Sequence, residues 1–328
     1  MKNPKVTILM SVYNGEKYLQ EAIDSILGQT FRDFEFLIVN DGSTDKTGEI
    51  LKSYNDPRIK IVNNEKNIGL TKSLNTGLRL ARGEYIARQD ADDISCDNKL
   101  ERQINFLDGN LDIAIVGTNY FRINEKGDII QEIKRQEKDK DIKKYLLNGN
   151  QLGHGTIMFR KSCFEKVGFY REEFKFAQDY DLVLRFSEKY KLANIPETLY
   201  KWRINSNSVS VSSKIIQDRY ANLALKLFIE RKKIGYDRLE KGEKIEEIFD
   251  NSFEVINKKE IFVGYFFWGM NFYNNKAYIN ALKNFLFIFF RFPIYPKLLF
   301  MIFKTLFCIL FPKNLVEATR RFKKFLDL

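Results

Sequence analysis

Short apolar runs alternate with amphipathic stretches along the first part of the chain. Short runs that predict strands occupy residues 6–12, 34–39, 58–62, 84–89 and 113–118. The run at 34–39 is apolar apart from Glu35, which is typical of a strand buried on both faces. Between these runs, apolar residues recur at helical spacing over residues 16–28, 44–54, 70–81 and 97–108. This alternation predicts an α/β fold with a mostly parallel central sheet and helices on both faces.

The pattern becomes more mixed in the second half of this region. It predicts a strand at 155–160, a short helix at 162–167, a helix from 178 to about 190 and a strand at 198–203. From residue 214 onward the spacing is helical, first in a charged stretch and then among many aromatic residues. We therefore predict an α/β domain at 1–213, a helical linker region at 214–260 and a tail at 261–328.

Composition excludes several classes of protein. With 44% hydrophobic and 30% charged residues, the chain is not of the intrinsically disordered class. Its three Cys are scattered, which predicts neither a disulfide framework nor a thiolate metal site. A single His excludes a His-rich metal site and disfavours a Ser-His-Asp triad. The run at 6–12 is too short for a signal-peptide core, so we expect the protein to stay on the cytoplasmic side.

The net charge of +11 is concentrated near the C-terminus. Residues 1–213 hold 33 Lys and Arg against 31 Asp and Glu, whereas residues 214–328 hold 21 against 12. Residues 261–328 also carry 20 of the 47 aromatic residues. Two modules follow: a charge-balanced front and a basic, aromatic tail.

The tail has apolar runs far below the ~18–20 residues that a membrane span needs. Basic residues between aromatic clusters indicate amphipathic helices that lie in the interface of an anionic bilayer, as in a peripheral protein of the inner membrane. The alternative is a helical subdomain that packs its aromatic residues on the rest of the chain or on a second copy in a homodimer. Nucleic acid is disfavoured as a partner because no RNA- or DNA-binding module is visible.

Two acidic clusters follow predicted strands. Asp90, Asp92 and Asp93 repel one another unless a cation or solvent offsets their charge, and Mg²⁺ or Mn²⁺ would do so. Asp41, after a neighbouring strand, has a carboxylate that could accept a hydrogen bond from a uracil N–H. Each cluster also suits a solvated turn that caps a helix, but both lie where ligands bind in α/β sheets.

A third acidic site opens the helix at 178. Asp179 or Asp181 could simply cap this helix, or one of them could face a cleft as the general base for a hydroxyl nucleophile while the other points into the fold. The single histidine, His154, is flanked by glycines. It has either a structural role or a place in an acceptor site.

Several familiar motifs are absent from the sequence. There is no phosphate-binding loop of the Gly-x-x-x-x-Gly-Lys-Ser/Thr type, no Gly-x-Gly-x-x-Gly after the first strand and no Gly-x-Ser-x-Gly elbow. Phosphate-loop NTPases, dinucleotide dehydrogenases and serine hydrolases therefore lose support.

A series of motifs, in order over roughly residues 4–210, closely resembles family-2 glycosyltransferases, which have the Rossmann-like GT-A fold. The nucleotide-side motifs are Val6 to Gly15, Asn40-Asp41-Gly42-Ser43-Thr44-Asp45, Asn67-x-Gly69 and Arg82-Gly83-Glu84-Tyr85-Ile86 leading into Asp90-Ala91-Asp92-Asp93. The acceptor-side motifs are His154 to Lys161 and Gln178 to Leu182.

The resemblance implies a role for individual residues. Those on the donor side are a uracil-reading carboxylate at Asp41, nucleoside neighbours at Tyr13 and Glu16, and a neighbour of the base at Arg58. Asp90 and Asp92 match the Asp-x-Asp that holds a metal and the diphosphate, with Asp93 as a donor-sugar contact or alternative ligand. Asp179 matches the general base, with His154 and Asp181 on the acceptor side. Gln178 and Asn205 depart from the common Glu and His of the family.

These roles imply an inverting transfer of a sugar from a UDP-sugar, with Mn²⁺ or Mg²⁺ as cofactor. Together with the interfacial tail they imply a lipid-linked acceptor, such as an undecaprenyl-diphosphate saccharide for O-antigen or capsule. Two alternatives are a nucleotidyltransferase, which usually needs a basic Gly-rich loop after the first strand, and a non-catalytic sugar-nucleotide-binding membrane protein. The donor sugar and the linkage position are not encoded in these motifs.

Overall fold

The computed structural model describes residues 3–204, 214–248, 270, 273, 278–291 and 296–310. The chain divides into two compact units, of which the first comprises residues 1–205 and 217–248 and the second residues 206–216 and 249–328. Residues 217–248, which fall within the predicted linker region at 214–260, are grouped with the first unit. These residues belong to the first unit because Arg231 and Asp237 form buried ion pairs with its side chains.

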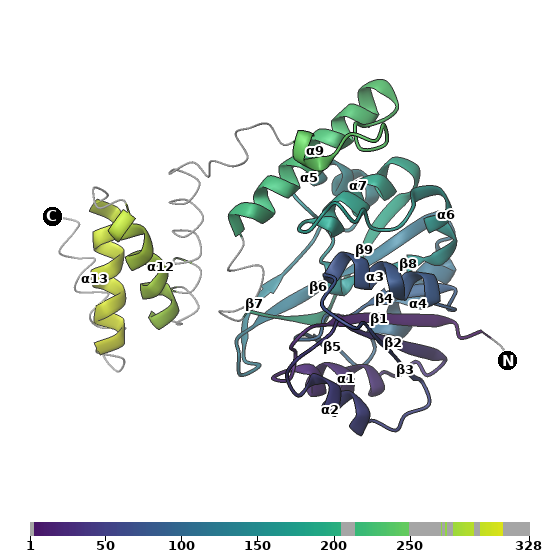
Figure 1. Ribbon diagram of the computed structural model, residues 1–328, viewed down its shortest axis with the longest axis horizontal. Helices are drawn as coiled ribbons and strands as arrows, with labels where there is room; N and C mark the ends of the chain where they lie inside the picture. Colours follow the sequence, from purple (N-terminus) through teal and green to yellow (C-terminus); the bar gives the residue numbers. More distant parts are fainter. Residues whose placement is uncertain are drawn as a thin grey trace. The chain divides into compact units, whose positions relative to one another are not determined.

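The described residues form a nine-stranded sheet in the order β3-β2-β1-β4-β8-β6-β9-β5, with β7 paired to β6 (Figure 1). The strands are β1 (Val6–Val12), β2 (Phe34–Asn40), β3 (Ile59–Asn63), β4 (Tyr85–Arg88), β5 (Ile94–Ser95), β6 (Ile113–Ile123), β7 (Ile129–Ile133), β8 (Met158–Arg160) and β9 (Lys191–Arg203).

The sheet is mixed, which corrects the prediction of a mostly parallel one. Strands β1 to β4 are parallel, as are β6 and β9. The short β8 runs antiparallel to both of its neighbours, β4 and β6. It begins just after a 3₁₀ turn, His154–Thr156. Two further pairs are also antiparallel: β7 with β6, as a hairpin, and β5 with β9.

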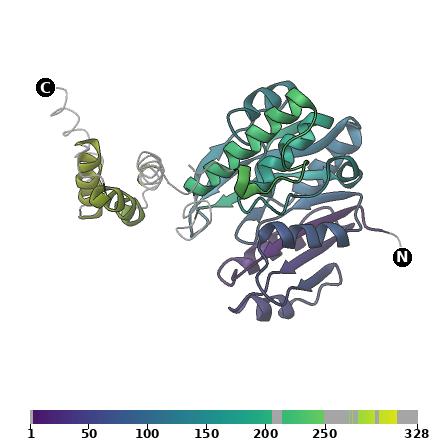
Figure 2. The ribbon, with the colours of Figure 1, turned by 45° about the horizontal axis from the view of Figure 1, so that its top comes forward.

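Helices cover both faces of the sheet, as predicted (Figure 2). Successive side chains of β1 point to opposite faces. Ile8 packs in one core with Ile23 and Leu100. Leu9, on the other face, lies so close to α3 that a Cβ on Gly77 would stand 2.1 Å from its Cδ1. The helices of this unit are α1 (Leu19–Leu27), α2 (Thr47–Ser53), α3 (Leu70–Leu80), α4 (Lys99–Gly109), α5 (Asp139–Leu146), α6 (Phe164–Val167), α7 (Gln178–Lys189), α9 (Lys214–Ile234) and α10 (Ile245–Ile248).

In the second unit the structure describes two helices, α12 (Tyr278–Arg291) and α13 (Pro296–Leu310). The two helices pack on each other, and Phe285 and Leu298 are buried. Tyr273 contacts Cys308, with 3.5 Å between hydroxyl oxygen and sulfur. Within the described ranges, no helix has both the length and the hydropathy needed to cross a bilayer.

Candidate active site

The predicted donor-side residues follow three neighbouring strands. β1 pairs in parallel with β2 and with β4, so the carboxyl ends of the three strands meet at one edge of the sheet (Figure 1). Tyr13 follows β1, Asp41 follows β2 and Asp90 lies two residues beyond β4. The structure therefore brings these three residues to the edge where α/β sheets bind ligands.

The loops after β1 and β2 are tied together by hydrogen bonds. Asn14, whose φ of 50° is left-handed, accepts a 2.8 Å hydrogen bond from the backbone N–H of Thr44 through its Oδ1. The Glu16 carboxylate accepts a 3.0 Å bond from the backbone N–H of Lys46, at the start of α2. Tyr13 is 47% exposed beside these contacts. Tyr13 is thus available to a ligand, while Glu16 braces the loop.

Asp41 is buried and organises the neighbouring loop. Its Oδ1 accepts hydrogen bonds from Asn64 Nδ2 at 2.8 Å and from the backbone N–H of Ile68 at 2.9 Å. Its Oδ2 accepts a third, from the backbone N–H of Gly69 at 2.9 Å. A carboxylate offers about four acceptor sites, so one remains for a donor on a ligand. The Asn67-x-Gly69 motif thus has a structural role, because its backbone N–H groups bind the Asp41 carboxylate.

The structure does not bring Arg58 to this edge. Arg58 immediately precedes β3, which runs parallel to β2, so it lies at the amino end of the strands. There its guanidinium pairs with Asp56 at 2.8 Å and stacks over Phe34 at 4.4 Å. The other predicted donor-side residues lie at the opposite end of the same strands, so the structure does not group Arg58 with them.

Asp90 is held by Arg88, the last residue of β4. Arg88 is 1% exposed and forms an ion pair with Asp90 Oδ1. Burial opposes the charged form of Asp90, but the nearby basic groups, Arg88 foremost, together outweigh it, so the pKa of Asp90 lies below its ordinary value. Asp90 is thus charged at neutral pH, and its side chain is partly exposed at the edge.

The two aspartates that follow are placed differently from each other. Asp92 is partly exposed, and its carbonyl oxygen accepts a 2.9 Å bond from Arg203 Nε. Asp93 is 1% exposed and accepts a 2.7 Å bond from the Arg203 backbone N–H. Burial, followed by the charges of Asp92 and Asp90, raises the pKa of Asp93 well above its ordinary value. Asp93 therefore lies in the interior of the fold.

The donor set at this edge fits a metal ion that arrives with a diphosphate. Among the described residues, no three His, Cys, Asp or Glu side chains gather closely enough to hold a metal by themselves. Mg²⁺ is usually bound through one or two carboxylates and completed by substrate phosphates and water. Asp90 and Asp92 supply two such carboxylates, both partly exposed.

The predicted acceptor-side residues meet the same edge. The structure places His154 in the turn before β8, where its Nε2 lies 3.2 Å from Arg88 Nε. Asp179 stands in the first turn of α7, and its Oδ2 accepts a 2.9 Å bond from Asn150 Nδ2. The charges of Asp90 and Asp179 both act on His154, where they oppose the lowering of its pKa. Asp90, His154 and Asp179 thus form one group.

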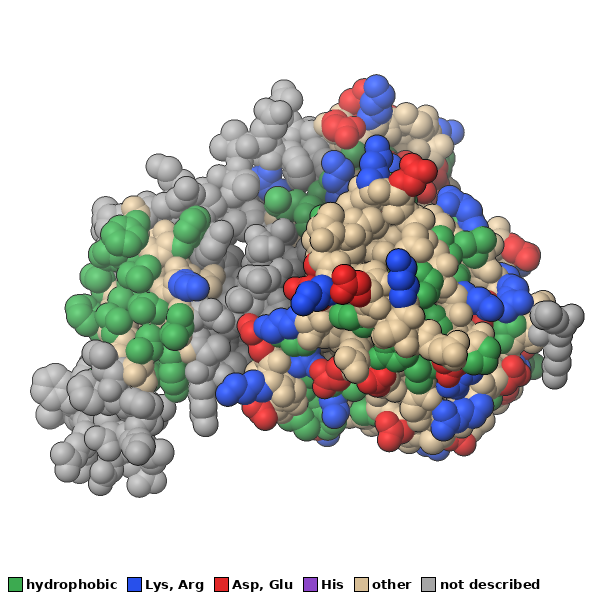
Figure 3. Space-filling model, turned by 60° about the horizontal axis from the view of Figure 1, so that its bottom comes forward, with side chains coloured by type: hydrophobic (Ala, Val, Ile, Leu, Met, Phe, Trp, Pro, Cys, Tyr) green, Lys and Arg blue, Asp and Glu red, His purple; other side chains and the backbone are tan. Residues whose placement is uncertain are grey.

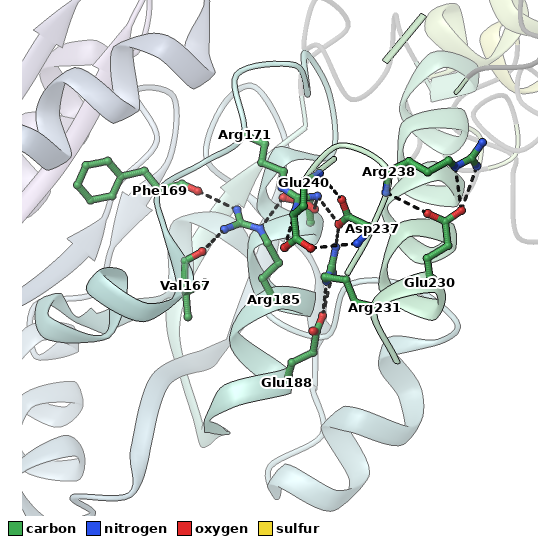
Figure 4. Close-up of polar contacts among 11 residues, drawn as sticks. Val167, Phe169, Arg171, Arg185, Glu188, Glu230, Arg231, Asp237, Arg238 and Glu240 are labelled. Atoms are coloured by element: carbon green, nitrogen blue, oxygen red, sulfur yellow. Dashed lines mark hydrogen bonds and ion pairs between the residues drawn. The ribbon is translucent and has the colours of Figure 1, made fainter. Parts of the chain in front are cut away.

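Asp181 points into the fold instead of into a cleft. It is fully buried and its Oδ2 accepts a 2.9 Å hydrogen bond from Arg185 Nε. Figure 4 shows the surrounding network, in which Arg171 pairs with Asp237 at 2.8 Å and Arg231 pairs with Glu188 at 2.8 Å. The network joins α7, α9 and the two loops at 167–171 and 237–240. Asp181 therefore supports the helix that carries Asp179.

Sequence reasoning missed several buried residues that connect the site. Lys99 is fully buried and its Nζ donates to the Arg88 carbonyl at 3.0 Å and to the Gly155 carbonyl at 2.7 Å, which links the end of β4 to the turn at His154. Burial lowers the pKa of Lys99 to about 7. One feature of the sequence indicated a role for Arg88, namely that this charged residue directly follows the apolar residues of a predicted strand. Asn205, which departs from the family pattern, lies outside the described residues.

Comparison with known sequences agrees with this arrangement. Residues 7–168 match the profile described as Glycosyl transferase family 2. An uncharacterized glycosyltransferase of Methanocaldococcus jannaschii is 38% identical over 71% of this chain and 82% of its own length. The O-antigen biosynthesis glycosyltransferase WbnJ of Escherichia coli is 35% identical over 70% of this chain and 91% of its own length.

Solved structures share the fold. TarS 1–349 of S. aureus in complex with UDP-GlcNAc has a TM-score of 0.55 at 21% identity, covering 67% of this chain and 66% of that one. The mannosyltransferase PcManGT of Pyrobaculum calidifontis, in complex with GDP-Man and Mn²⁺, has a TM-score of 0.52 at 18% identity, covering 69% and 64%. Fold and sequence together define a glycosyltransferase. The chain belongs to glycosyl transferase family 2.

Proposed function

We propose that the chain transfers a sugar from a UDP-sugar to a hydroxyl group of a lipid-linked saccharide, with inversion at the anomeric carbon. The TarS structure with UDP-GlcNAc supports a UDP-sugar as donor. The relative from Escherichia coli supports a place in O-antigen or similar surface-polysaccharide assembly. Within that proposal we take the acceptor to be an undecaprenyl-diphosphate saccharide.

The observation that carries this proposal is the grouping of Asp90, His154 and Asp179. Arg88 contacts both Asp90 and His154, and Asn150 holds one oxygen of Asp179. A nucleotide diphosphate at Asp90 would place its sugar toward Asp179. The site therefore has a leaving-group end and a base end.

The reaction follows from these positions. Asp179 accepts the proton of the acceptor hydroxyl as that oxygen forms a bond to the anomeric carbon. The bond from this carbon to the UDP oxygen breaks on the opposite face, and UDP leaves with the electron pair. An α-linked donor thus yields a β-glycoside.

Asp90 and Asp92 are the residues that would hold the metal ion and the diphosphate. A bound Mn²⁺ or Mg²⁺ offsets the charge that builds on the leaving diphosphate. The complex of PcManGT with Mn²⁺ supports a metal in a protein of this fold. Asp93, being buried, is assigned to the support of the loop.

The test is release of UDP from a panel of UDP-sugars, with purified lipid-linked saccharides as acceptors. We expect Asp179→Asn to retain UDP binding and to lose at least about 100-fold in transfer, the contribution of a general base. Asp112→Asn is the matched control, because Asp112 is exposed and pairs with Lys191 at 2.8 Å. Transfer by Asp179→Asn at the wild-type rate would show that the base assignment is wrong. Activity with GDP-sugars and none with UDP-sugars would show that the proposed donor is wrong.

We also propose that the tail binds the cytoplasmic face of an anionic bilayer as a peripheral element. Exposed apolar side chains recur on α12 and α13, including Ile279 at 64%, Phe290 at 78% and Phe303 at 68%. In Figure 3 the visible face of this helix pair is mostly hydrophobic, whereas charges of both signs intermix on the visible face of the first unit. The excess of Lys and Arg in the tail suits anionic lipid headgroups.

Vesicle sedimentation of the full chain tests this surface. We expect binding to vesicles that contain phosphatidylglycerol, weaker binding to phosphatidylcholine alone, and loss of binding in the double variant Phe290→Ser/Phe303→Ser. The control is Leu111→Ser/Ile129→Ser, which changes two exposed apolar residues of the first unit. Unchanged sedimentation of the tail variant would contradict the proposal, as would conversion of a dimer to a monomer without any vesicle binding.

A further inference from the structure

The single histidine of the chain is held by a group that can only donate. Arg88 Nε points at His154 Nε2 over 3.2 Å, while the Arg88 Nη1 donates to the carbonyls of Leu9 and Gln89 at 2.7 and 2.9 Å. A guanidinium has no acceptor and keeps its protons at all ordinary pH values. Nε2 of His154 must therefore present a lone pair.

Tyr170 contacts the same nitrogen. Its hydroxyl oxygen lies 2.8 Å from His154 Nε2. Burial raises the pKa of Tyr170, so the phenol keeps its proton and donates it to Nε2. Tyr170 is itself fixed to α3, because Asn75 accepts a 3.1 Å bond from its backbone N–H and donates a 2.9 Å bond to its carbonyl. Two anchored donors thus converge on one ring nitrogen.

The protonation state of the other ring nitrogen, Nδ1, follows from these two contacts. Burial, and then the charge of Arg88, lower the pKa of His154 to about 4 despite the opposing charges of Asp90 and Asp179. The neutral ring carries one proton, and with Nε2 unprotonated that proton sits on Nδ1. Within the described residues no group accepts a hydrogen bond from Nδ1, and this atom is not buried.

We propose that His154 presents its Nδ1–H to a sugar hydroxyl oxygen at the reaction centre, and that Arg88 and Tyr170 are the positioning residues that set its tautomer. The proposal rests on the proposed function, since it takes the ligand to be a sugar between Asp90 and Asp179. It makes His154 a fixed hydrogen-bond donor that leaves proton removal to Asp179.

The tautomer can be observed without any substrate. Because the chain has one histidine, a long-range ¹H–¹⁵N correlation spectrum of the uniformly labelled full chain reports on His154 alone. At pH 7 we expect a protonated Nδ1 and an unprotonated Nε2. In Arg88→Met/Tyr170→Phe the Nε2–H form should rise. A wild-type spectrum with Nε2 protonated would overturn the proposal, whatever the enzyme acts on.

Two substitutions separate the ring nitrogens in kinetics. The amide nitrogen of His154→Asn stands close to the place of Nδ1, whereas the amide of His154→Gln reaches the place of Nε2 and can still meet Arg88. If the Nδ1–H is what the reaction needs, the Asn variant keeps about tenfold more kcat/KM than the Gln variant, the rate equivalent of one hydrogen bond. If His154 only supports Arg88, the order is reversed, and that result or equal values would refute the proposal.

Two assays distinguish whether the hydroxyl that His154 contacts belongs to the donor sugar or to the acceptor. A loss shared by transfer and by hydrolysis of the UDP-sugar without acceptor assigns the contact to the donor sugar. A loss confined to transfer, with a raised KM for the acceptor, assigns it to the acceptor. UDP affinity and melting temperature of both variants should match the wild type. Absence of any transfer by the wild type would refute the proposed function, while the spectrum would still decide the tautomer.

Discussion

Asp237 should be a principal stabilising residue of the first unit, although it lies outside the family match. Its side chain is fully buried and pairs with Arg171 at 2.8 Å and with Arg231. Its pKa is lowered, since these arginines and the backbone N–H of Glu240 outweigh the effect of burial. Asp237→Ala leaves two largely buried guanidinium groups without their shared carboxylate.

The expected cost follows from the partners that remain. Breaking a buried ion pair costs about 3–5 kcal/mol. Here Arg231 keeps Glu188 at 2.8 Å, and Arg171 keeps Glu240 at 3.4 Å. We therefore expect a loss near the lower end, about 3 kcal/mol in the free energy of unfolding. For a unit of this size that corresponds to a fall in melting temperature of about 6–12 °C.

The measurement is guanidinium chloride and thermal unfolding of the full chain, followed by far-UV circular dichroism. Asp112→Ala is the control, because it removes an exposed carboxylate whose loss should change little. Because the pKa of Asp237 is lower in the folded state, its carboxylate stabilises the fold at pH values above its unfolded pKa of about 3.9. This stabilisation is lost as the pH falls below that value. The difference in the free energy of unfolding between the wild type and Asp237→Ala should therefore become smaller below about pH 4. A loss no larger than the control's at pH 7 would refute the reasoning.

Three further predictions concern the sheet and the site. Glu35 is buried, and Thr7 and Arg82 outweigh its burial and lower its pKa, so Glu35→Gln should unfold more easily at pH 7 and lose this difference as pH falls below about 4.5. Unfolding free energies at the two pH values check this, and a constant difference would contradict it. Gly83→Ala places a Cβ 2.3 Å from the Thr7 backbone nitrogen, so it should lower the melting temperature, unlike Gly109→Ala, whose Cβ meets nothing within 4 Å. Gly155→Ala places a Cβ 2.0 Å from the hydroxyl of Tyr200, which holds the Asp90 backbone N–H at 3.2 Å. We expect a lower kcat/KM for transfer, and an unchanged value would mean that Tyr200 does not help to place Asp90.

The central strands at the front of the fold were predictable because they are buried on both faces. β1 and β2 are almost wholly buried, and a continuous apolar run indicates this directly. β7 and α5 were missed for the opposite reason. In α5 only Ile142 and Leu146 are buried among charged residues, so the apolar signal is two residues long. Pairing direction was not readable either, since the orientation of β8 depends on contacts with β4 and β6.

The acidic residues of the site were predictable because aspartates gather where strands end. Their supporting residues were not, because Arg88 meets His154 across 66 positions of sequence. The place of Arg58 at the amino end of its strand was readable from the sequence. The predicted strand began at that residue, which already placed it at the amino end. Asp181 shows the limit of motif reasoning: two carboxylates in one helical turn face different surroundings, and only packing tells which one is buried.

The two units are interleaved along the chain. Residues 206–216 belong to the second unit, whereas residues 217–248 return to the first. A gene truncated near residue 205 would therefore remove Asp237 and Arg231 together with the tail, and would expose Arg171 and Asp181. Exchange of tails between relatives by one recombination event would do the same. Replacement after Ile248 preserves the first unit's own residues, so a different tail is most readily acquired at that junction.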